Sequence, residues 1–248
     1  MQRLPSGARL DLFDRIDSTS AEAKRRAAAG ETGPLWILAR EQTSGYGRRG
    51  RPWESRFGDF AGTFLFRPDR DPATFAQLSF VAGLAVYHAL SDYADENVLA
   101  LKWPNDVLLA GKKIAGLLLE RIESESGPLV SVGVGVNIVS APAGTPYPTA
   151  RLIDRLRTGR AVPEPADLAV AIDREWGAAY TVWAREDFSV TRDKWLRVAK
   201  GVGEAIRVNL PGETLEGVFD GVDETGALIL RQGDARRIIT AGEIMFGD

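Results

Sequence analysis

Hydrophobic and polar residues follow two repeats along the first 200 positions, and each repeat predicts one kind of element. Apolar runs bounded by Gly, Pro, Asn or Asp are typical of strands, and apolar residues three and four apart are typical of helices. Strands are predicted at residues 9–16, 35–41, 62–67, 97–103, 106–110, 113–121 and 129–138. Helices are predicted at residues 21–29, behind Asp71-Pro72, at 165–185 and at 190–198.

After Gly201 the pattern changes to short strands separated by turn signals. These strands are predicted at residues 204–209, 214–222, 226–230 and 235–240. Regularly spaced short strands predict a small β-barrel. We therefore expect one domain over residues 1–200 and a second, smaller domain over residues 201–248.

Local signals mark the ends of several elements. Thr19-Ser20-Ala21-Glu22 fits a capping box in front of the first helix. Asp71 before Pro72 fits an N-cap followed by proline at the first helical position. Residues 110–112 predict a tight turn between the strands 106–110 and 113–121, which would form a hairpin.

The composition of the 248 residues excludes several kinds of chemistry. The chain has no cysteine, which excludes disulfides, thiolate metal sites and a cysteine nucleophile. Its one histidine, His88, lies in a helical pattern and is interpreted as structural. There is no run of 18 apolar residues and no apolar signal core at the N-terminus. We expect a cytoplasmic protein whose chemistry depends on Arg, Lys, Asp, Asn and backbone amides.

The richest candidate for chemistry is the segment 41–53. Three glycines and three arginines lie between Gly45 and Arg51, and Arg40 to Arg56 contains five cations and two carboxylates, a local +3 on a chain of net −3. Glycine lets a backbone approach a ligand closely, and arginine matches phosphate and carboxylate oxygens. This Gly/Arg loop is either an anion site or a basic surface loop.

A second motif decides between these alternatives. Lys102-Trp103-Pro104-Asn105-Asp106 is followed after a short strand by Gly111-Lys112-Lys113-Ile114-Ala115-Gly116. The two motifs, in this order, resemble the biotin–protein ligases, and the resemblance runs from about Leu10 to the C-terminus. It implies an α+β fold: a mixed, mostly antiparallel sheet packed by helices, as in class II synthetases, followed by a small SH3-like β-barrel.

The resemblance also implies a reaction and its substrates. Biotin's carboxylate would attack the α-phosphate of ATP, which carries Mg²⁺, and a lysine of an acceptor protein would then displace AMP from biotinyl-5′-AMP. The implied acceptor is the biotin carboxyl carrier protein of acetyl-CoA carboxylase or of a related biotin-dependent carboxylase. No glycine pattern of a P-loop or of a dinucleotide-binding fold is present, so ATP would bind without either.

Site residues follow from the motif matches. Biotin is expected to contact Ser18, Thr19, Ser20, Gln42, Gly45, Tyr46, Gly47, Arg48, Lys113 and Gly116. The nucleotide is expected to contact Arg48, Arg51, Trp53, Asn105 and Asn137. Arg48 and Lys113 would neutralise the reacting anions, with Arg51 beside them, and Asp106 would orient or deprotonate the acceptor's amine or else serve only as a turn residue. Lys113, rather than Lys112, directly precedes Ile-Ala-Gly, and no residue is assigned to a metal.

Two departures from the family pattern are visible. Tyr46 stands where the family often has a second arginine, which makes a phosphate role at that position doubtful. Only 16 residues precede Asp17, so we expect no repressor domain and no DNA binding, and the lack of a long apolar run predicts no membrane partner. The net −5 of residues 201–248 also disfavours nucleic acid. A lipoate or octanoate transferase, a non-catalytic basic adaptor and a homodimer all stay open.

Overall fold

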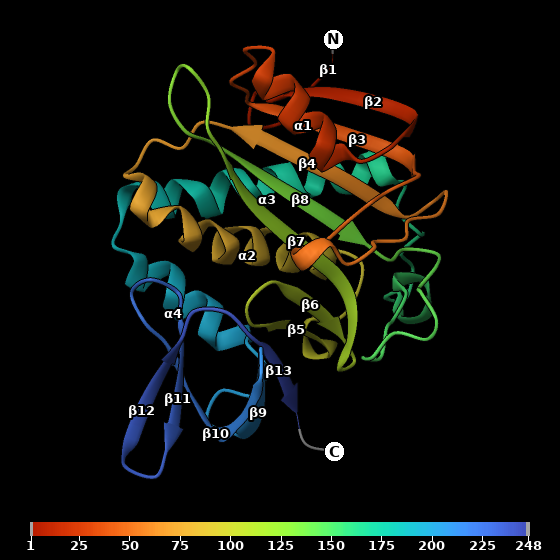
Figure 1. Cartoon of the computed structure of the whole chain (residues 1–248). Helices are drawn as coiled ribbons and strands as arrows, with labels where there is room; N and C mark the ends of the chain where they lie inside the picture. The colour runs from red at the N-terminus through yellow and green to blue at the C-terminus, as the bar shows by residue number, and fades with distance from the viewer. Residues whose placement is uncertain (1, 247–248) are drawn as a thin grey trace.

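The computed structural model describes residues 2–246. The larger of its two sheets lies at the centre of the molecule (Figure 1). The strand order is β1-β2-β3-β4-β8-β7-β6-β5. Its strands are β1 (Gln2–Arg3), β2 (Arg9–Ile16), β3 (Leu35–Gln42), β4 (Phe60–Phe66), β5 (Leu99–Lys102), β6 (Asp106–Leu109), β7 (Lys112–Ile122) and β8 (Leu129–Val136). Within the described residues only β2 and β3 pair in parallel, so the sheet is mixed and mostly antiparallel, as predicted.

Helices cover both faces of this sheet. They are α1 (Thr19–Ala28), α2 (Leu78–Ser91), α3 (Pro165–Arg185) and α4 (Phe188–Val198), with 3₁₀ turns at Arg48–Gly50, Pro72–Gln77, Glu96–Val98 and Leu152–Arg155. Alternation along β3 shows the two faces: Leu35 and Ile37 pack with α1, whereas Trp36 and Leu38 join the main core beneath α2 and α3. Figure 1 shows α1 on one side of the sheet and α2 and α3 on the other.

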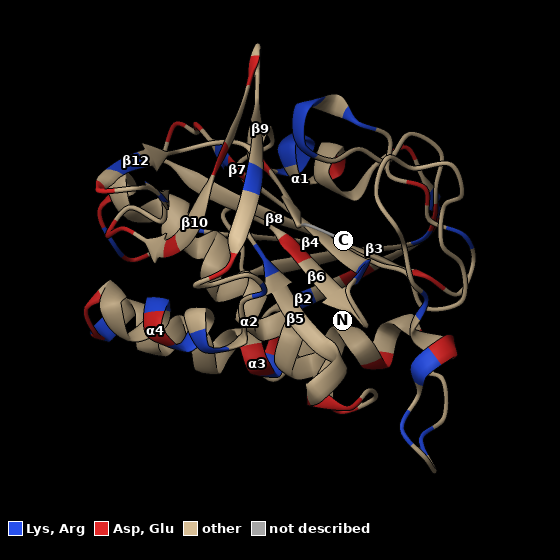
Figure 2. Cartoon of the chain, turned by 90° about the horizontal axis from the view of Figure 1, so that it is seen from below, with Lys and Arg blue, Asp and Glu red and all other residues tan. Residues whose placement is uncertain are grey.

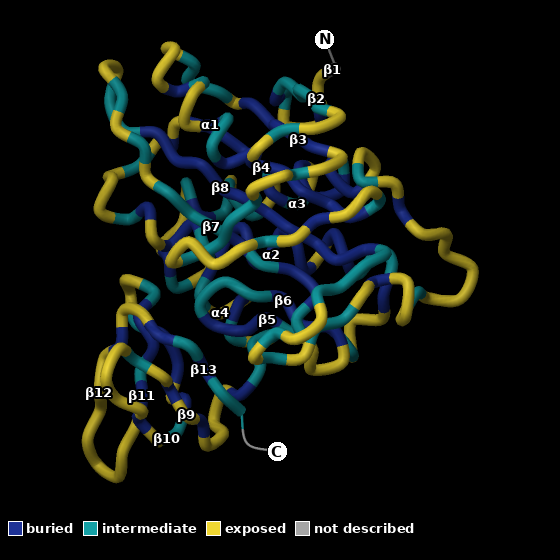
Figure 3. The backbone as a smooth tube through the Cα atoms, turned by 45° about the vertical axis from the view of Figure 1, so that its right-hand side comes forward, coloured by how far each residue is buried: buried dark blue, intermediate teal, exposed yellow. Residues whose placement is uncertain are grey.

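Helix α2 is the apolar centre of the core. The stretch Pro72–Ser91 is the one helical stretch of residues 2–246 that is long and apolar enough to cross a membrane by length and composition. However, 72% of an 18-residue window of this stretch is buried inside the protein, where α2 packs against α3 and the sheet. This burial is typical of the core helix of a globular domain. Figure 3 shows the same contrast, with buried backbone at the centre and exposed backbone in the loops.

Charged side chains lie mostly outside this core. β4 and β8, at the middle of the sheet, carry none. Figure 2 shows acidic and basic residues spread along α3, α4 and the loops.

The first helix begins two residues earlier than predicted, and its cap is Ser18 rather than Thr19. The Ser18 hydroxyl accepts from the backbone N–H of Ala21. Thr19 is buried, and both its backbone N–H and its hydroxyl donate to Gln42. The N-cap therefore lies one residue before the predicted one, and the capping box does not form, since Ala21 stands three residues after Ser18 and Glu22 pairs with Arg25 and Arg26. The predicted cap at Asp71 is confirmed, since its carboxylate accepts from Ala73 N–H.

Residues after Gly201 form a five-stranded antiparallel, SH3-like sheet of order β12-β11-β10-β9-β13. Its strands are β9 (Ala205–Leu210), β10 (Glu213–Val222), β11 (Leu228–Gln232), β12 (Ala235–Ile239) and β13 (Glu243–Phe246). Four of these were predicted, and β13 was missed. The small sheet packs on the larger unit, where Trp103 Nε1 donates to the carbonyl of Gly226 at 3.0 Å.

Candidate active site

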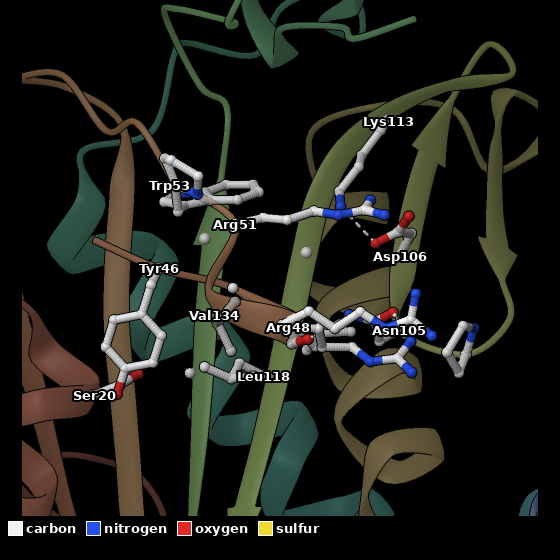
Figure 4. A pocket seen from close by; sticks show the side chains of 18 of the residues that line it. Ser20, Tyr46, Arg48, Arg51, Trp53, Asn105, Asp106, Lys113, Leu118 and Val134 are labelled. Carbon is white, nitrogen blue, oxygen red and sulfur yellow. Dashed lines mark hydrogen bonds and ion pairs between the residues drawn. The ribbon is translucent and has the colours of Figure 1, made fainter. Parts of the chain in front are cut away.

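A cleft opens on the α1 face of the large sheet, and its empty space, open mouth included, is about 950 Å³. Its walls are the Gly/Arg loop, the hairpin β6–β7, strand β8, Tyr147 and the start of β13. Figure 4 shows that Ser20 and Tyr46 lie at one end and that Lys113 and Asp106 lie at the other. We call these the hydroxyl end and the cationic end.

The hydroxyl end is a buried network of small polar side chains. Thr63 Oγ1 donates to Thr19 Oγ1 at 2.8 Å, and the Ser20 and Thr63 hydroxyls lie 3.1 Å apart. Gln42 Oε1 accepts from Thr19 N at 2.9 Å and from Thr19 Oγ1 at 3.1 Å. Because these groups hold one another, they present fixed donors and acceptors to the cleft.

Tyr46 lies beside this network and not among the arginines. Its hydroxyl donates to Glu120 at 3.5 Å, and Lys24 Nζ contacts the same carboxylate at 2.8 Å. Lys24 Nζ also lies 5.4 Å from the centre of the Tyr46 ring. The ring is therefore held at the hydroxyl end, away from the cationic end.

The Gly/Arg loop is folded back on itself. Trp53 N donates to the carbonyl of Gly45 at 2.9 Å, and Gly47 N donates to the carbonyl of Arg51 at 2.8 Å. A side chain at position 45 would lie 2.6 Å from the Trp53 carbonyl oxygen, so only glycine allows this closure. The closed loop places Trp53 and Arg48 over the sheet.

Arg48 is held by the second motif. Its Nη1 donates to Asn105 Oδ1 at 3.1 Å, and Asn105 Nδ2 donates in turn to the carbonyl of Leu117 at 2.6 Å. Burial lowers the pKa of Arg48, and the positive charges of Arg49 and Arg51 lower it further. A half-buried cation beside two others gains from an anion.

Arg51 is paired with the small C-terminal sheet. Its Nη2 donates to Glu243 Oε2 at 2.9 Å and its Nη1 to Oε1 at 3.4 Å. The hydrogen bond from Arg51 lowers the pKa of Glu243, and the same contact raises the pKa of Arg51. The small sheet thus supplies a carboxylate to the mouth of the cleft.

Lys113 reaches the cleft through a β-bulge. Asp106 pairs with Gly116 and Val107 with Ala115, but Leu108 pairs with Lys113, so Ile114 is the extra residue. In a regular strand, positions 113 and 116 would face opposite sides. The bulge turns Lys113 toward Gly116, whose added Cβ would lie 3.2 Å from Lys113 Nζ.

The Lys113 ammonium has three neighbours in the cleft. Nζ lies 2.7 Å from Asp106 Oδ1. It also lies 5.7 Å from the ring centre of Trp53 and 5.0 Å from that of Tyr147. Asp106 therefore lines the cleft and forms an ion pair with Lys113.

Lys102 lines the same cleft, and its role was not predicted. Its side chain is almost fully buried, and burial lowers its pKa, against the attraction of Asp106 and Glu243. The sequence signal that could have placed Lys102 in the cleft was its position as the first residue of the Lys-Trp-Pro-Asn-Asp motif. Tyr147 and Glu243 were also missed, because both come from segments far away in the sequence.

Glycines of β8 and β7 form the floor. A Cβ at Gly135 would lie 2.2 Å from the Trp53 indole, and one at Gly133 would lie 2.8 Å from Ser20 Oγ. Gly116 also faces Trp53, at 3.1 Å from an added Cβ. These positions let the ring and the hydroxyl lie directly on the sheet.

Most of the predicted site residues meet in this cleft. Those that line it are Thr19, Ser20, Gln42, Tyr46, Gly47, Arg48, Arg51, Trp53, Asn105, Asp106, Lys113 and Gly116. Three do not line it: Ser18 caps α1, Gly45 closes the loop, and the buried Asn137 donates to the carbonyl of Ala150 at 3.2 Å. Their direct contact with a ligand stays a prediction.

Comparison with known proteins identifies the family. Residues 12–137 match the Biotin/lipoate A/B protein ligase family, and residues 201–247 match the Biotin protein ligase C terminal domain. The chain is 45% identical over 245 residues to the biotin–[acetyl-CoA-carboxylase] ligase of Paracoccus denitrificans, which spans 95% of this chain and 100% of that protein. The chain belongs to the biotin–protein ligase family.

Two further relatives agree with this assignment. The biotin–[acetyl-CoA-carboxylase] ligase of Mycobacterium tuberculosis is 31% identical over 242 residues, covering 95% of this chain and 88% of that protein. The biotin protein ligase of Aquifex aeolicus, solved in complex with biotin and ATP, superposes with a TM-score of 0.80 at 25% identity, over 96% of this chain and 97% of that one. The α+β fold with an SH3-like C-terminal unit is thereby confirmed.

Proposed function

We propose that this biotin–protein ligase joins biotin to a lysine of a biotin carboxyl carrier protein, as the names of its relatives indicate for them. One observation carries the proposal: a single cleft joins a buried hydroxyl network to a group of cations. Biotin's ring carries a urea group, which suits fixed donors and acceptors, and its carboxylate must meet a phosphate, which requires positive charge.

In the first step a biotin carboxylate oxygen attacks the α-phosphorus of ATP, the bond from that phosphorus to the β-bridging oxygen breaks, and pyrophosphate leaves. Both reactants are anions, so positioning and charge neutralisation are the main tasks. We assign these tasks to Arg48, Lys113 and Lys102. Trp53 would lie beside the adenine base, and Arg51 would release Glu243 and bind phosphate oxygens instead.

In the second step the acceptor's lysine nitrogen attacks the carboxyl carbon of biotinyl-5′-AMP. The carbon–oxygen bond to AMP breaks, an amide forms, and the amine loses a proton. Asp106 is the assigned acceptor of that proton or the group that orients the amine. Its neighbour Lys113, 2.7 Å away, would turn from Asp106 toward the phosphate when the ligand is present.

Magnesium is expected to arrive with ATP. The described residues contain no cluster of three or more His, Cys, Asp or Glu side chains that could hold a metal ion. We also assign residues 1–200 to the catalytic domain and residues 201–248 to the small C-terminal domain that completes the cleft through Glu243.

The test is incubation of the purified chain with labelled biotin, MgATP and a carrier domain, with lipoate and octanoate in parallel reactions. Label should enter the carrier only with ATP and should disappear when the acceptor lysine is replaced by arginine. Transfer of lipoate or octanoate in place of biotin would contradict the assignment. A lack of pyrophosphate release with any acid would contradict catalysis itself.

A further inference from the structure

Two loops enclose the cationic end of the cleft. The Gly/Arg loop supplies Trp53, and the loop of residues 140–150 supplies Tyr147. Lys113 Nζ lies near both rings, at 5.7 Å from the centre of Trp53 and 5.0 Å from that of Tyr147. The position of this lysine therefore depends on the relative placement of two segments that are far apart in the sequence.

The second loop is fixed at its far end by β7. Lys113 N donates to the carbonyl of Pro148, and Ala150 N donates to the carbonyl of Lys113, each at 2.9 Å. Its near end, where β8 finishes, is bound by the carboxylate of Asp59, which follows the Gly/Arg loop and directly precedes β4.

Asp59 binds both segments at once. Its Oδ1 accepts three consecutive backbone N–H groups, from Ile138 and Val139 at 2.9 Å and from Ser140 at 3.0 Å. Its Oδ2 accepts from the Arg56 N–H at 3.2 Å and from the Ser140 hydroxyl. Three successive amides around one oxygen form an anion-binding nest.

Burial and packing support the same contact. Asp59 is 2% exposed, and a buried carboxylate is tolerated only with such a set of donors. The neighbouring Gly58 has φ +94°, and a Cβ there would lie 2.9 Å from Val139 Cγ2. Segments 56–59 and 138–140 are thus in direct contact through backbone, side chain and charge.

We propose that Asp59 is a positioning residue that couples the Gly/Arg loop to the loop of residues 140–150, so that both close on the nucleotide as one unit. Asp59 does not line the cleft. It acts through the loops that carry Arg48, Trp53 and Tyr147. The nucleotide part of this inference rests on the proposed function, whereas the coupling of the loops does not.

The test compares Asp59→Asn with Asp173→Asn. Asp173 is a matched control because it is also a buried carboxylate, which accepts from Ser6 N, Ser6 Oγ and Trp36 Nε1 at 2.7–2.9 Å, and it lies in α3 on the opposite face of the sheet. Asp59→Asn places an amide donor where the carboxylate now accepts. Amide hydrogen exchange of the ligand-free proteins and the KM values for ATP and for biotin are measured.

Asp59→Asn should speed exchange in segments 42–58 and 138–150 together and raise the KM for ATP about tenfold or more, as expected for the loss of hydrogen bonds to a charged group. The KM for biotin should change less, because Thr19, Ser20 and Gln42 have their own supports. Asp173→Asn should lower the melting temperature without changing exchange in either loop or the KM for ATP.

Two results would overturn the proposal: faster exchange in only one of the loops, or a stability loss in Asp59→Asn with unchanged loop exchange. If Asp59→Asn does not fold, Ser140→Ala removes one donor alone. It should still loosen both segments to a smaller extent, and a response confined to 138–150 would count against coupling. Amide exchange is measured without ligand, so it tests the coupling of the two loops independently of biotin transfer. The loops can be coupled in a chain that transfers no biotin, and they can be uncoupled in an active ligase.

Discussion

At the scale of single residues, Lys113 and Lys112 give the sharpest comparison. Lys113 contacts Asp106 at 2.7 Å inside the cleft, whereas the adjacent Lys112 is exposed. Lys113→Ala should reduce pyrophosphate release about 10²–10³-fold, the loss expected for one preorganised electrostatic donor. Lys112→Ala should retain most activity. A larger defect in Lys112→Ala would show that the assignment of the two lysines is reversed.

Lys102 allows stability and activity to be separated. Its ammonium is buried, and burial disfavours its charged form, which lowers its pKa. Lys102→Met keeps the volume and removes the buried charge, so the melting temperature should stay the same or rise. Pyrophosphate release should nevertheless fall at least about tenfold, because a cation facing the phosphates is lost.

Lys200→Met is the matched control for this change. Both lysines face the Phe246 ring, at 5.8 Å for Lys102 and 4.5 Å for Lys200, but Lys200 does not line the cleft. Lys200→Met should leave pyrophosphate release nearly unchanged. Full activity in Lys102→Met would remove Lys102 from the proposed machinery.

The sequence located residues in the cleft where a motif ties chemistry to spacing, and missed residues that reach it through tertiary contacts. Lys113 lies in the cleft, as expected from its place before Ile-Ala-Gly. If side chains alternated regularly along β7 from Gly116, Lys113 would face away from the cleft. The bulge at Ile114 turns Lys113 back toward the cleft, and no sequence signal marks this bulge. Tyr147 and Glu243 could not be found by spacing, since only the folded chain brings them to Lys113 and Arg51.

At the scale of elements, strand β8 separates the two ends of the cleft. Gly135 lies under the Trp53 indole, and Gly133 lies against Ser20. Gly135→Ala should displace the indole and raise the KM for ATP about tenfold, a change of roughly 1.4 kcal/mol. Gly133→Ala should instead raise the KM for biotin.

Each variant serves as the control for the other, because both add one methyl group to the same strand. KM values for the two substrates, with circular dichroism to confirm folding, decide the matter. An equal effect of both substitutions on ATP would show that β8 does not divide the cleft in this way.

Element types were predicted well, and their ends less well. The continuous apolar run of β3 predicts a buried strand, and β3 is in fact buried on both faces over residues 35–39, whereas α2 was found by its three-and-four spacing although it is buried nearly all round. The start of α1 was misplaced because Thr19 is bound by Gln42, a contact 23 residues away in the sequence. Strand β13 was missed because only four residues, Glu243–Phe246, pair with β9.

At the scale of the whole molecule, the small sheet is part of the cleft and not an appendage to it. The division into a mixed unit and a tail of short strands could be read from the change of pattern at Gly201. The packing of the two units could not, because it depends on contacts such as Trp103 with Gly226 and Arg51 with Glu243. The missed strand β13 is the one that carries Glu243 to the mouth of the cleft.

The pair of Arg51 and Glu243 should make this packing depend on pH. Arg51 holds the pKa of Glu243 below its usual 4.5. A lowered carboxylate pKa contributes stability that is present above the unfolded value and is lost as the pH falls through the folded value. The partial exposure of the pair limits its contribution to about 1 kcal/mol or less, so the effect is local.

At about pH 7, Glu243→Gln should speed amide exchange in residues 45–53 and 241–246, and the difference from the unaltered chain should vanish as Glu243 protonates at acid pH. Glu213→Gln breaks a similar pair with Arg237 within the small sheet and should leave residues 45–53 unchanged. Equal exchange in Glu243→Gln and the unaltered chain at neutral pH would mean that this ion pair does not hold the Gly/Arg loop to the small sheet.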